Sequence, residues 1–283
     1  MKIAITGSNG FLAQYFCKFT GLNKRDVFFL TTSPPVKGQL LCQSLYSDID
    51  VILNKKNIDT IIHFASVIPV LFSDSDYDLF SKNNKMMRNL YNFSIKSHLK
   101  KFIYSSSFGS MNNPKLLDIK DYYTMSKITG EYFCSMMEAN NIETASLRIS
   151  APYGEFSSAR TVLNIFTEKA MKNENIEIFG SGKREQNFTY AGDIVRAIEL
   201  ALKNKVSGVY SIVAKSNTNM ENLANTIIRL TNSSSKIITG KNNDLQEGYS
   251  PNYDYEKAKQ EFGYSPVYTL ERGLERYIKW LNK

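Results

Sequence analysis

Tyr123 and Lys127 are the residues whose types and spacing most directly suggest chemistry. Residues four apart share one face of a helix, and Tyr122 to Lys127 lead into a helical pattern at 128–140. A free tyrosine titrates at about pH 10, and a nearby ammonium favours the phenolate, so Lys127 would tune Tyr123 as an acid/base. Such a phenol can exchange a proton with a carbinol while a hydride moves to or from a nicotinamide. Ser107 could hydrogen-bond the same substrate oxygen.

The first thirteen residues hold a second pattern, a Gly-rich turn between a strand and a helix. The apolar run 3–5 has no polar face, as expected of a central strand covered on both sides. Gly7 permits a tight turn, Gly10 lets a pyrophosphate approach backbone N–H groups at the helix start, and Ala13 lets the helix pack on the strand. A plain turn is the alternative, but this context favours dinucleotide binding. The predicted contacts are Gly7, Ser8, Asn9, Gly10, Phe11 and Leu12.

The end of the second predicted strand, 27–31, bears on the choice of dinucleotide. An acidic residue there would bind the ribose 2′-hydroxyl of NAD and repel a 2′-phosphate. This chain has Thr31, Thr32 and Ser33 instead, with Lys37 beyond. Hydroxyl donors and a cation suit a phosphate, so the sequence favours NADP, with NAD as the alternative.

Further cofactor contacts are predicted along the next elements. Asp48 could bond the adenine amine or simply cap a helix. The strand through Ile62 ends at His63, and small residues after it would let the backbone pass close to the cofactor. We interpret His63 as a packed strand-end residue. The remaining predicted cofactor contacts are Asp48, Ile49, Phe64, Ala65, Ser66, Asn83 (on a helix at 79–97), Tyr123 and Lys127.

Composition sets the class of protein. The 283 residues, 42% hydrophobic and 22% charged, indicate one large globular domain or two joined ones. No apolar run approaches the roughly 20 residues that cross a bilayer, and no charged leader is present, so we expect a cytoplasmic protein without a membrane partner. The net charge is +8, and the Lys and Arg residues are scattered along the chain with no dense basic run. This pattern favours binding of small anions such as nucleotides over binding of nucleic acid. Cys17, Cys42 and Cys134 are read as reduced core thiols, and no metal site is expected.

Strands and helices alternate regularly up to residue 154 and less regularly afterwards. This alternation predicts an α/β fold, a doubly wound (Rossmann) parallel sheet with a smaller α/β C-terminal substrate lobe. The expected dinucleotide-binding domain is 1–154 with a return of the chain at about 186–214, and the expected substrate lobe is 155–185 and 215–283. The active site would lie in the crevice between them. Expected strands are 27–31, 60–62, 100–107, 144–149, 176–180 and 209–213, and later helices are 162–171 and 193–202.

Taken together, these residues resemble the extended short-chain dehydrogenase/reductase family, the group of nucleotide-sugar epimerases, dehydratases and reductases. The resemblance covers almost the whole chain. It is carried by Thr6-Gly7-x-x-Gly10-x-x-Ala13, Asp48-Ile49, the run 63–66, Asn83, Ser105 to Ser107, Tyr123-x-x-x-Lys127, Leu147-Arg148 through Tyr153-Gly154, Ile178 to Gly182, Asn187 to Tyr190 with Asp193, and matching residues within 254–274.

The resemblance implies roles for several residues. Ser107, Tyr123 and Lys127 would form the catalytic trio, with Lys127 also holding the nicotinamide ribose. Phe179 would stack on or edge the substrate's nucleobase. A homodimer formed through two helices, including the one with Tyr123, is also implied.

Departures from the family pattern narrow the reaction. Phe108 and Gly109 stand where 4,6-dehydratases carry Asp-Glu, and Gly109 replaces the cysteine of the double epimerase/reductases. Elimination and epimerisation beside the carbonyl are therefore disfavoured. Reduction of a keto-sugar or 4-epimerisation by oxidation and re-reduction remains.

The predicted substrate side departs as well. Gln186 replaces one phosphate-clamping arginine of the family, and Lys241-Asn-Asn-Asp244 replaces another. A lysine binds phosphate only as a point charge, so the exchange is not conservative. Arg184 or Arg160 would compensate; without compensation the substrate would not be a nucleotide sugar. The predicted substrate contacts are Arg160, Thr161, Phe179, Arg184, Gln186 and Lys241.

These features favour an NADPH-dependent reductase that converts a 4-keto-6-deoxy nucleotide sugar to its alcohol. The alternative is a nucleotide-sugar 4-epimerase with tightly bound NAD. A hypothesis of another class is a non-catalytic, cofactor-sensing regulator with the same fold, against which the intact Ser107, Tyr123 and Lys127 set argues.

Overall fold

A computed structural model describes residues 1–31, 39–41, 45–46, 49–53, 56–69, 74–109 and 121–283. Its centre is a seven-stranded sheet in the order β11-β6-β5-β4-β1-β2-β3, and all neighbouring strands are parallel. The strand order reverses beside β1, so the predicted doubly wound α/β fold is confirmed. The strands are β1 (Ile3–Thr6), β2 (Val27–Thr31), β3 (Gln39–Leu41), β4 (Thr60–His63), β5 (Lys101–Ser107), β6 (Glu143–Ile149) and β11 (Ser207–Ile212).

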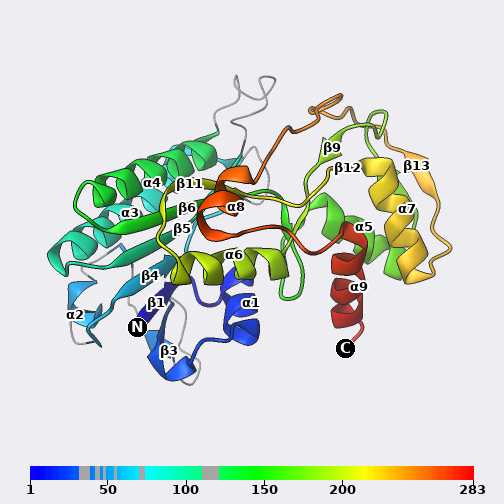
Figure 1. The fold of residues 1–283 in the computed structure, drawn as a ribbon. Coiled ribbons are helices and arrows are strands. Elements are labelled where there is room, and N and C mark those ends of the chain that lie inside the picture. The colour runs from blue at the N-terminus through cyan, green and yellow to red at the C-terminus, as the bar shows by residue number, and fades with distance from the viewer. Residues whose placement is uncertain (32–38, 42–44, 47–48, 54–55, 70–73, 110–120) are drawn as a thin grey trace.

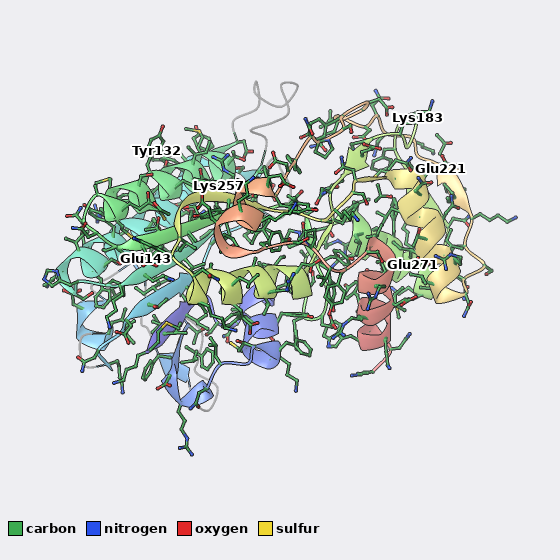
Figure 2. All side chains as sticks on the ribbon, viewed as in Figure 1. Tyr132, Glu143, Lys183, Glu221, Lys257 and Glu271 are labelled. Carbon is green, nitrogen blue, oxygen red and sulfur yellow. The ribbon has the colours of Figure 1, made fainter. Side chains whose placement is uncertain are left out.

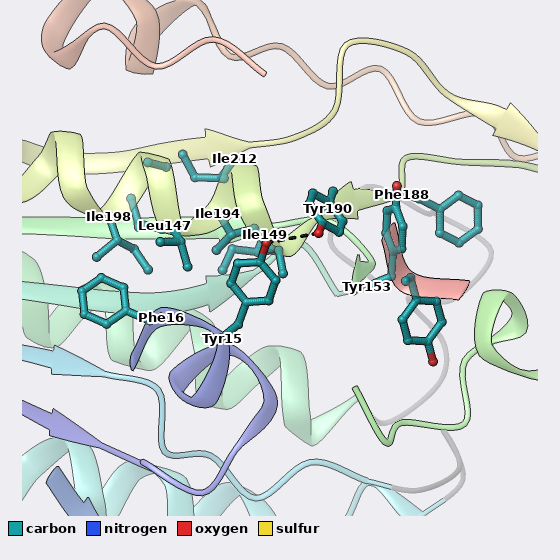
Figure 3. Close-up of a cluster of buried hydrophobic side chains, with 14 of the residues drawn as sticks. Tyr15, Phe16, Leu147, Ile149, Tyr153, Phe188, Tyr190, Ile194, Ile198 and Ile212 are labelled. Carbon is teal, nitrogen blue, oxygen red and sulfur yellow. Dashed lines mark hydrogen bonds between the residues drawn. The ribbon is translucent and has the colours of Figure 1, made fainter. Parts of the chain in front are cut away.

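Helices cover both faces of this sheet (Figure 1). One face carries α1 (Phe11–Phe19) and α6 (Ala191–Lys203), and the other carries α2 (Asp50–Leu53), α3 (Tyr77–Lys96) and α4 (Tyr122–Glu138). The helix predicted at 79–97 begins two residues earlier because Asp76 caps it, accepting a hydrogen bond from the backbone N–H of Leu79 at 2.8 Å. Each face has its own apolar core. Figure 3 shows the core under α1 and α6, where Phe16, Leu147 and Ile198 meet.

The C-terminal lobe lies at one end of the sheet, on the right in Figure 1. It consists of three helices and two short strand pairs, β8 with β13 and β9 with β12, while β7 pairs with β10 at the junction with the sheet. The expected division of the chain stays a prediction, and α8 (Glu256–Phe262) packs against β11 of the main sheet. The elements are β7 (Pro152–Tyr153), α5 (Val162–Met171), β8 (Ile176–Ile178), β9 (Glu185–Gln186), β10 (Thr189–Tyr190), β12 (Thr218–Asn219), α7 (Met220–Thr231), β13 (Ile237–Thr239) and α9 (Leu270–Leu281).

Candidate active site

The turn between β1 and α1 has the geometry that its glycines predict. Gly7 has φ +68°, and a Cβ there would lie 2.7 Å from the backbone nitrogen of Ala65, so both conformation and space require glycine. The N–H of Gly10 donates to the carbonyl of Gly7 at 2.8 Å, and α1 begins at Phe11. The first turn of α1 therefore presents backbone N–H groups beside a close approach of two loops, which suits a phosphate group.

A cavity of about 960 Å³ begins at this turn and extends to the first turns of α4. Its size suits a dinucleotide, since ligand pockets span about 300–1,000 Å³. Among the described lining residues, the charged ones are Lys127 and Arg160, so the cavity favours an anionic ligand. The predicted residues that line it are Gly7, Asn9, Gly10, Phe11, Leu12, Thr31, Phe64, Ala65, Ser66, Ser107, Tyr123, Lys127, Arg160 and Thr161.

Three predicted cofactor residues lie behind the cavity wall. The buried Ser8 hydroxyl donates to the carbonyl of Leu30 at 3.1 Å and ties the turn to β2. Asn83 accepts from the N–H of Val67 at 2.7 Å and donates to its carbonyl at 3.0 Å, so it braces a loop that lines the cavity. Ile49 is part of the apolar core. The predicted contacts Thr32, Ser33 and Asp48 lie outside the described residues.

Ser107, Tyr123 and Lys127 converge on the far end of the cavity, as their spacing predicts. The side chains of Tyr123 and Ser107 lie close enough for the serine hydroxyl to influence the pKa of the tyrosine. Lys127 lies one turn further along α4, with Nζ 5.5 Å from the centre of the Tyr123 ring and donating to the carbonyl of Ser105 at 2.9 Å. Asp121 caps this helix by accepting from the N–H of Thr124 at 2.9 Å, which fixes where the tyrosine emerges.

Burial sets the protonation of Tyr123 and Lys127 in the ligand-free chain. It raises the pKa of Tyr123 well above the usual value; Asp121 adds to the rise and the Ser107 hydroxyl opposes it. Burial also lowers the pKa of Lys127 to about 7, against an opposing effect of Glu131. The expected depression of the Tyr123 pKa by Lys127 is therefore outweighed by desolvation. At neutral pH the phenol keeps its proton and can act as a general acid.

A buried carboxylate behind the trio joins three elements of the site. Glu131 accepts from the Ser106 hydroxyl at 2.6 Å and from Arg148 through two hydrogen bonds at 2.8 and 2.6 Å. This bidentate pair links α4, β5 and β6 directly under the Ser107 and Lys127 positions. Glu131 belongs to none of the predicted site residues, although its spacing of four from Lys127 places both on one helix face.

His63 is a structural residue of the strand end. Its Nδ1 lies 2.7 Å from the Thr6 hydroxyl oxygen, and its ring stacks on Tyr104 with centroids 5.7 Å apart. Burial, together with the charge of Lys127, lowers the pKa of His63 to about 3, so the ring is neutral. The interpretation of His63 as a packed residue is confirmed.

The predicted substrate residues divide into two groups. Arg160 and Thr161 line the cavity, whereas Phe179, Arg184, Gln186 and Lys241 lie in the lobe outside its described lining. Arg184 pairs with Asp244 at 2.7 Å and donates to the side chains of Gln246 and Gln186 at 3.1 and 3.4 Å. To compensate for the missing arginine, Arg184 would have to exchange these partners for a phosphate. The exposed ring of Phe179 lies against Gly240.

Among the described residues, no group of three or more His, Cys, Asp or Glu side chains is arranged to hold a metal ion. None of the helices that the structure describes has both the length and the apolar composition to cross a membrane.

The doubly wound fold and this cavity are those expected of the extended short-chain dehydrogenase/reductase family. The chain belongs to the NAD dependent epimerase/dehydratase family, whose model matches residues 3–213.

Individual proteins are similar to this chain in sequence or in structure. A protein from Methanocaldococcus jannaschii that bears a provisional UDP-glucose 4-epimerase name is 27% identical, over 99% of this chain and 98% of its own. The dTDP-4-dehydro-6-deoxyglucose reductase of Escherichia coli is 25% identical, over 82% of this chain and 78% of its own. A solved UDP-glucuronic acid 4-epimerase from Bacillus cereus, a variant form in complex with NAD and a fluorinated UDP-sugar, has a TM-score of 0.85 at 21% identity. That alignment covers 100% of this chain and 99% of the solved one.

Proposed function

We propose that the chain is a nucleotide-sugar 4-epimerase that retains NAD through the catalytic cycle. The observation that carries this proposal is one continuous cavity, with a phosphate-binding turn at one end and the Ser107, Tyr123 and Lys127 trio at the other. The full-length similarity to a provisional UDP-glucose 4-epimerase, and the NAD in a solved 4-epimerase of the same fold, favour epimerisation over the reductase that the sequence analysis preferred.

The residues fit NAD by their shape and charge. Gly7 and Gly10 leave room for a phosphate at the α1 terminus, and Lys127 would hold the ribose next to the reacting carbon. NAD, when bound there, supplies a reversible hydride acceptor. The chain itself supplies the proton transfer and the orientation of the sugar.

Tyr123 would carry the proton between enzyme and sugar hydroxyl. Oxidation of the sugar hydroxyl needs the Tyr123 phenolate to accept its proton. Reduction of the keto group back to a hydroxyl needs the Tyr123 phenol to donate that proton, so one tyrosine serves both halves of the cycle. Ser107 would hydrogen-bond the same sugar oxygen and hold it beside the Tyr123 hydroxyl. A protonated Lys127 would favour the phenolate during oxidation.

The test begins with the purified protein. We expect NAD to copurify and be detected after denaturation, and UDP-glucose to convert to UDP-galactose without added cofactor. Loss of the reaction after stripping NAD, and its recovery on adding NAD back, would complete the evidence. Protein that lacks bound NAD and interconverts none of the UDP-, dTDP-, GDP- or CDP-sugars would contradict the proposal.

A reductase that uses NADPH is the second candidate, and one observation favours it specifically. Thr31 lines the cavity at the end of β2 and accepts from the Asn9 side chain at 3.0 Å, and none of the described lining residues is acidic. This arrangement lacks the carboxylate that would repel a 2′-phosphate. The E. coli reductase among the relatives is consistent with this activity.

Cofactor competition separates the two candidates. For the epimerase we expect tighter binding of NADH than of NADPH in a fluorescence titration, and no net oxidation of either during turnover. Stoichiometric consumption of NADPH with a dTDP-4-keto-6-deoxy sugar would establish the reductase instead.

We also propose a homodimer formed through α3 and α4. Exposed apolar side chains follow the outer face of α4 at Met125, Tyr132 and Met136, and α3 adds Tyr77. Tyr132 is visible on this surface in Figure 2. We expect a dimer by light scattering that Tyr132→Asp converts to monomer, because an unpaired carboxylate would be buried in the interface. A monomeric wild-type protein would contradict this proposal.

A further inference from the structure

Phe108 is a buried aromatic residue that immediately follows the proposed catalytic serine. It is 6% exposed, yet it belongs to neither apolar core of the sheet and does not line the cavity. Its ring stacks on Tyr253, with centroids 3.9 Å apart and planes at 20°. Of the ring pairs in the described part of the chain, this one has the shortest centroid separation. A residue of the catalytic strand end is thus held by a residue 145 positions later in the chain.

The turn that contains Phe108 holds the Ser107 hydroxyl beside Tyr123. The N–H of Gly109 donates to the Ser107 oxygen at 3.2 Å, and this serine hydroxyl influences the pKa of Tyr123. Gly109 has φ +53°, and a Cβ there would lie 1.8 Å from the Thr124 hydroxyl oxygen, so the turn packs directly on the first turn of α4. A shift of Phe108 would therefore move the serine relative to the tyrosine.

Tyr253 ends a segment that is anchored in the C-terminal lobe. The carbonyl of Tyr249 accepts from the N–H of Glu185 at 2.9 Å, and the Tyr249 and Tyr253 hydroxyls lie 3.3 Å apart. The carbonyl of Pro251 accepts from Asn217 at 2.6 Å. The segment from β13 to α8, orange in Figure 1, thus runs from the lobe back to the sheet.

The same segment begins at the predicted substrate contacts. Asp244 pairs with Arg184 at 2.7 Å, and Gln246, two residues later, accepts from the same guanidinium at 3.1 Å. Residues 244–253 therefore connect the predicted substrate contacts of the lobe to the Phe108 ring. Binding energy gained at a distant part of a substrate can be used to align the reacting groups. Residues 244–253 could couple substrate binding in the lobe to the position of Ser107 in this way.

We propose that Tyr253 is a positioning residue, through which the docked C-terminal lobe sets the Ser107 hydroxyl by stacking on Phe108. The proposal rests on the proposed function, because it assigns Ser107 to the proton-transfer step. Neither aromatic ring touches the cavity, so their effect is on alignment. Because the Phe108 ring occupies the space beside Ser107, position 108 supplies neither an acid nor a base.

The first test compares turnover of UDP-glucose by four variants. Tyr253→Ala and Phe108→Ala should lower kcat by about 10- to 100-fold, the cost of a small misplacement of a reacting group, with little change in KM or NAD affinity. Tyr253→Phe keeps the ring and should restore the rate. Tyr255→Ala removes a half-buried tyrosine two residues beyond this segment, whose ring faces Tyr264, and should be near wild type. A kcat for Tyr253→Ala equal to that of Tyr255→Ala would overturn the proposal.

The second test needs no substrate and separates this proposal from the proposed function. Hydrogen exchange by mass spectrometry would follow the amide of Gly109 in the wild type, in Tyr253→Ala and in Tyr255→Ala. We expect faster exchange in Tyr253→Ala and wild-type exchange in Tyr255→Ala. If the wild type turns over none of the sugars, the proposed function fails, and exchange alone decides the coupling. Equal exchange in the two variants would overturn the coupling whatever the activity.

Discussion

Two tyrosines, Tyr190 and Tyr123, differ in the groups that surround their hydroxyls. Tyr190 donates to a Glu155 carboxylate oxygen at 2.7 Å and accepts from Tyr15 at 3.1 Å and from Arg276 Nε at 2.8 Å (Figure 3 shows the Tyr15 contact). Tyr123 lies beside Ser107 and lines the cavity.

The difference lies in the hydrogen-bonding capacity that each hydroxyl has left. Burial raises the pKa of both tyrosines, so the direction of the pKa shift does not distinguish them. Tyr190 has every position of its hydroxyl filled by protein groups, and it joins α1, the β7–β10 region and α9. Tyr123 keeps a position for a ligand oxygen. A strongly perturbed pKa therefore indicates function only where a cavity gives access to the group.

The largest effect is expected from Tyr123→Phe. Turnover should fall by about 10²- to 10⁴-fold, because the proton carrier is removed, while NAD affinity and the free energy of unfolding change little. Steady-state kinetics and a denaturant titration would measure both. Tyr122→Phe is the matched control, since its ring packs against Tyr77 and Phe80. Turnover lost equally in both variants would contradict the assignment of Tyr123.

Lys127→Met should stabilise the ligand-free protein, and most strongly at low pH. Burial lowers the pKa of Lys127 from 10.5 to about 7, so between these values the unfolded chain binds a proton that the folded chain does not. Wild-type stability therefore rises with pH across this window. Below pH 7 the buried, protonated Lys127 lowers the free energy of unfolding by the full amount, about 3–5 kcal/mol.

Urea titrations at pH 6 and pH 9.5 would measure this effect. The stability gain of Lys127→Met over wild type should be large at pH 6 and small at pH 9.5, reduced at both by the lost hydrogen bond to Ser105. A stability gain that does not depend on pH would show that Lys127 titrates normally. The contrast between the cavity around Tyr123 and the filled surroundings of Tyr190 would then lose its electrostatic basis.

Tyr190→Phe should act on stability and leave the chemistry intact. It removes the hydrogen bonds that Glu155 and Arg276 make with the Tyr190 hydroxyl and leaves their ion pair at 3.6 Å, which should lower the free energy of unfolding by about 1–3 kcal/mol. Chemical denaturation would give the loss, and kcat should stay near the wild-type value. If the variant were as stable as the wild type but inactive, the two tyrosines would have to exchange roles.

The smallest effect is expected from Tyr15→Phe. It removes one of the three hydrogen bonds of Tyr190 and leaves the pair with Glu155 in place, so the cost should be about 1 kcal/mol. The melting temperature should fall by a few degrees. A loss as large as that of Tyr190→Phe would mean that the cluster is one cooperative network, as buried polar networks can be.

The sequence predicted most of the main sheet and many of the residues that line the cavity. Six of the seven sheet strands lie within a few residues of their predicted ranges, β3 was not predicted, and the α5 boundaries match the prediction at 162–171. Local signals are sufficient there: apolar runs specify buried strands, and small residues at fixed spacing specify the turn at Gly7. Helices α7, α8 and α9 were not assigned individually, because the C-terminal half lacks the regular alternation of strand and helix.

The residue types and spacings by themselves determined which side chains could meet. A Tyr-x-x-x-Lys pair shares a helix face, and a serine at a strand end points to the ligand edge of a parallel sheet, whatever the rest of the chain does. Tertiary structure alone decided that Arg184 pairs with Asp244, that Phe108 stacks on Tyr253, and that desolvation sets the charges of Tyr123 and Lys127. These contacts join residues 60 or more positions apart or depend on burial, and no local pattern encodes either.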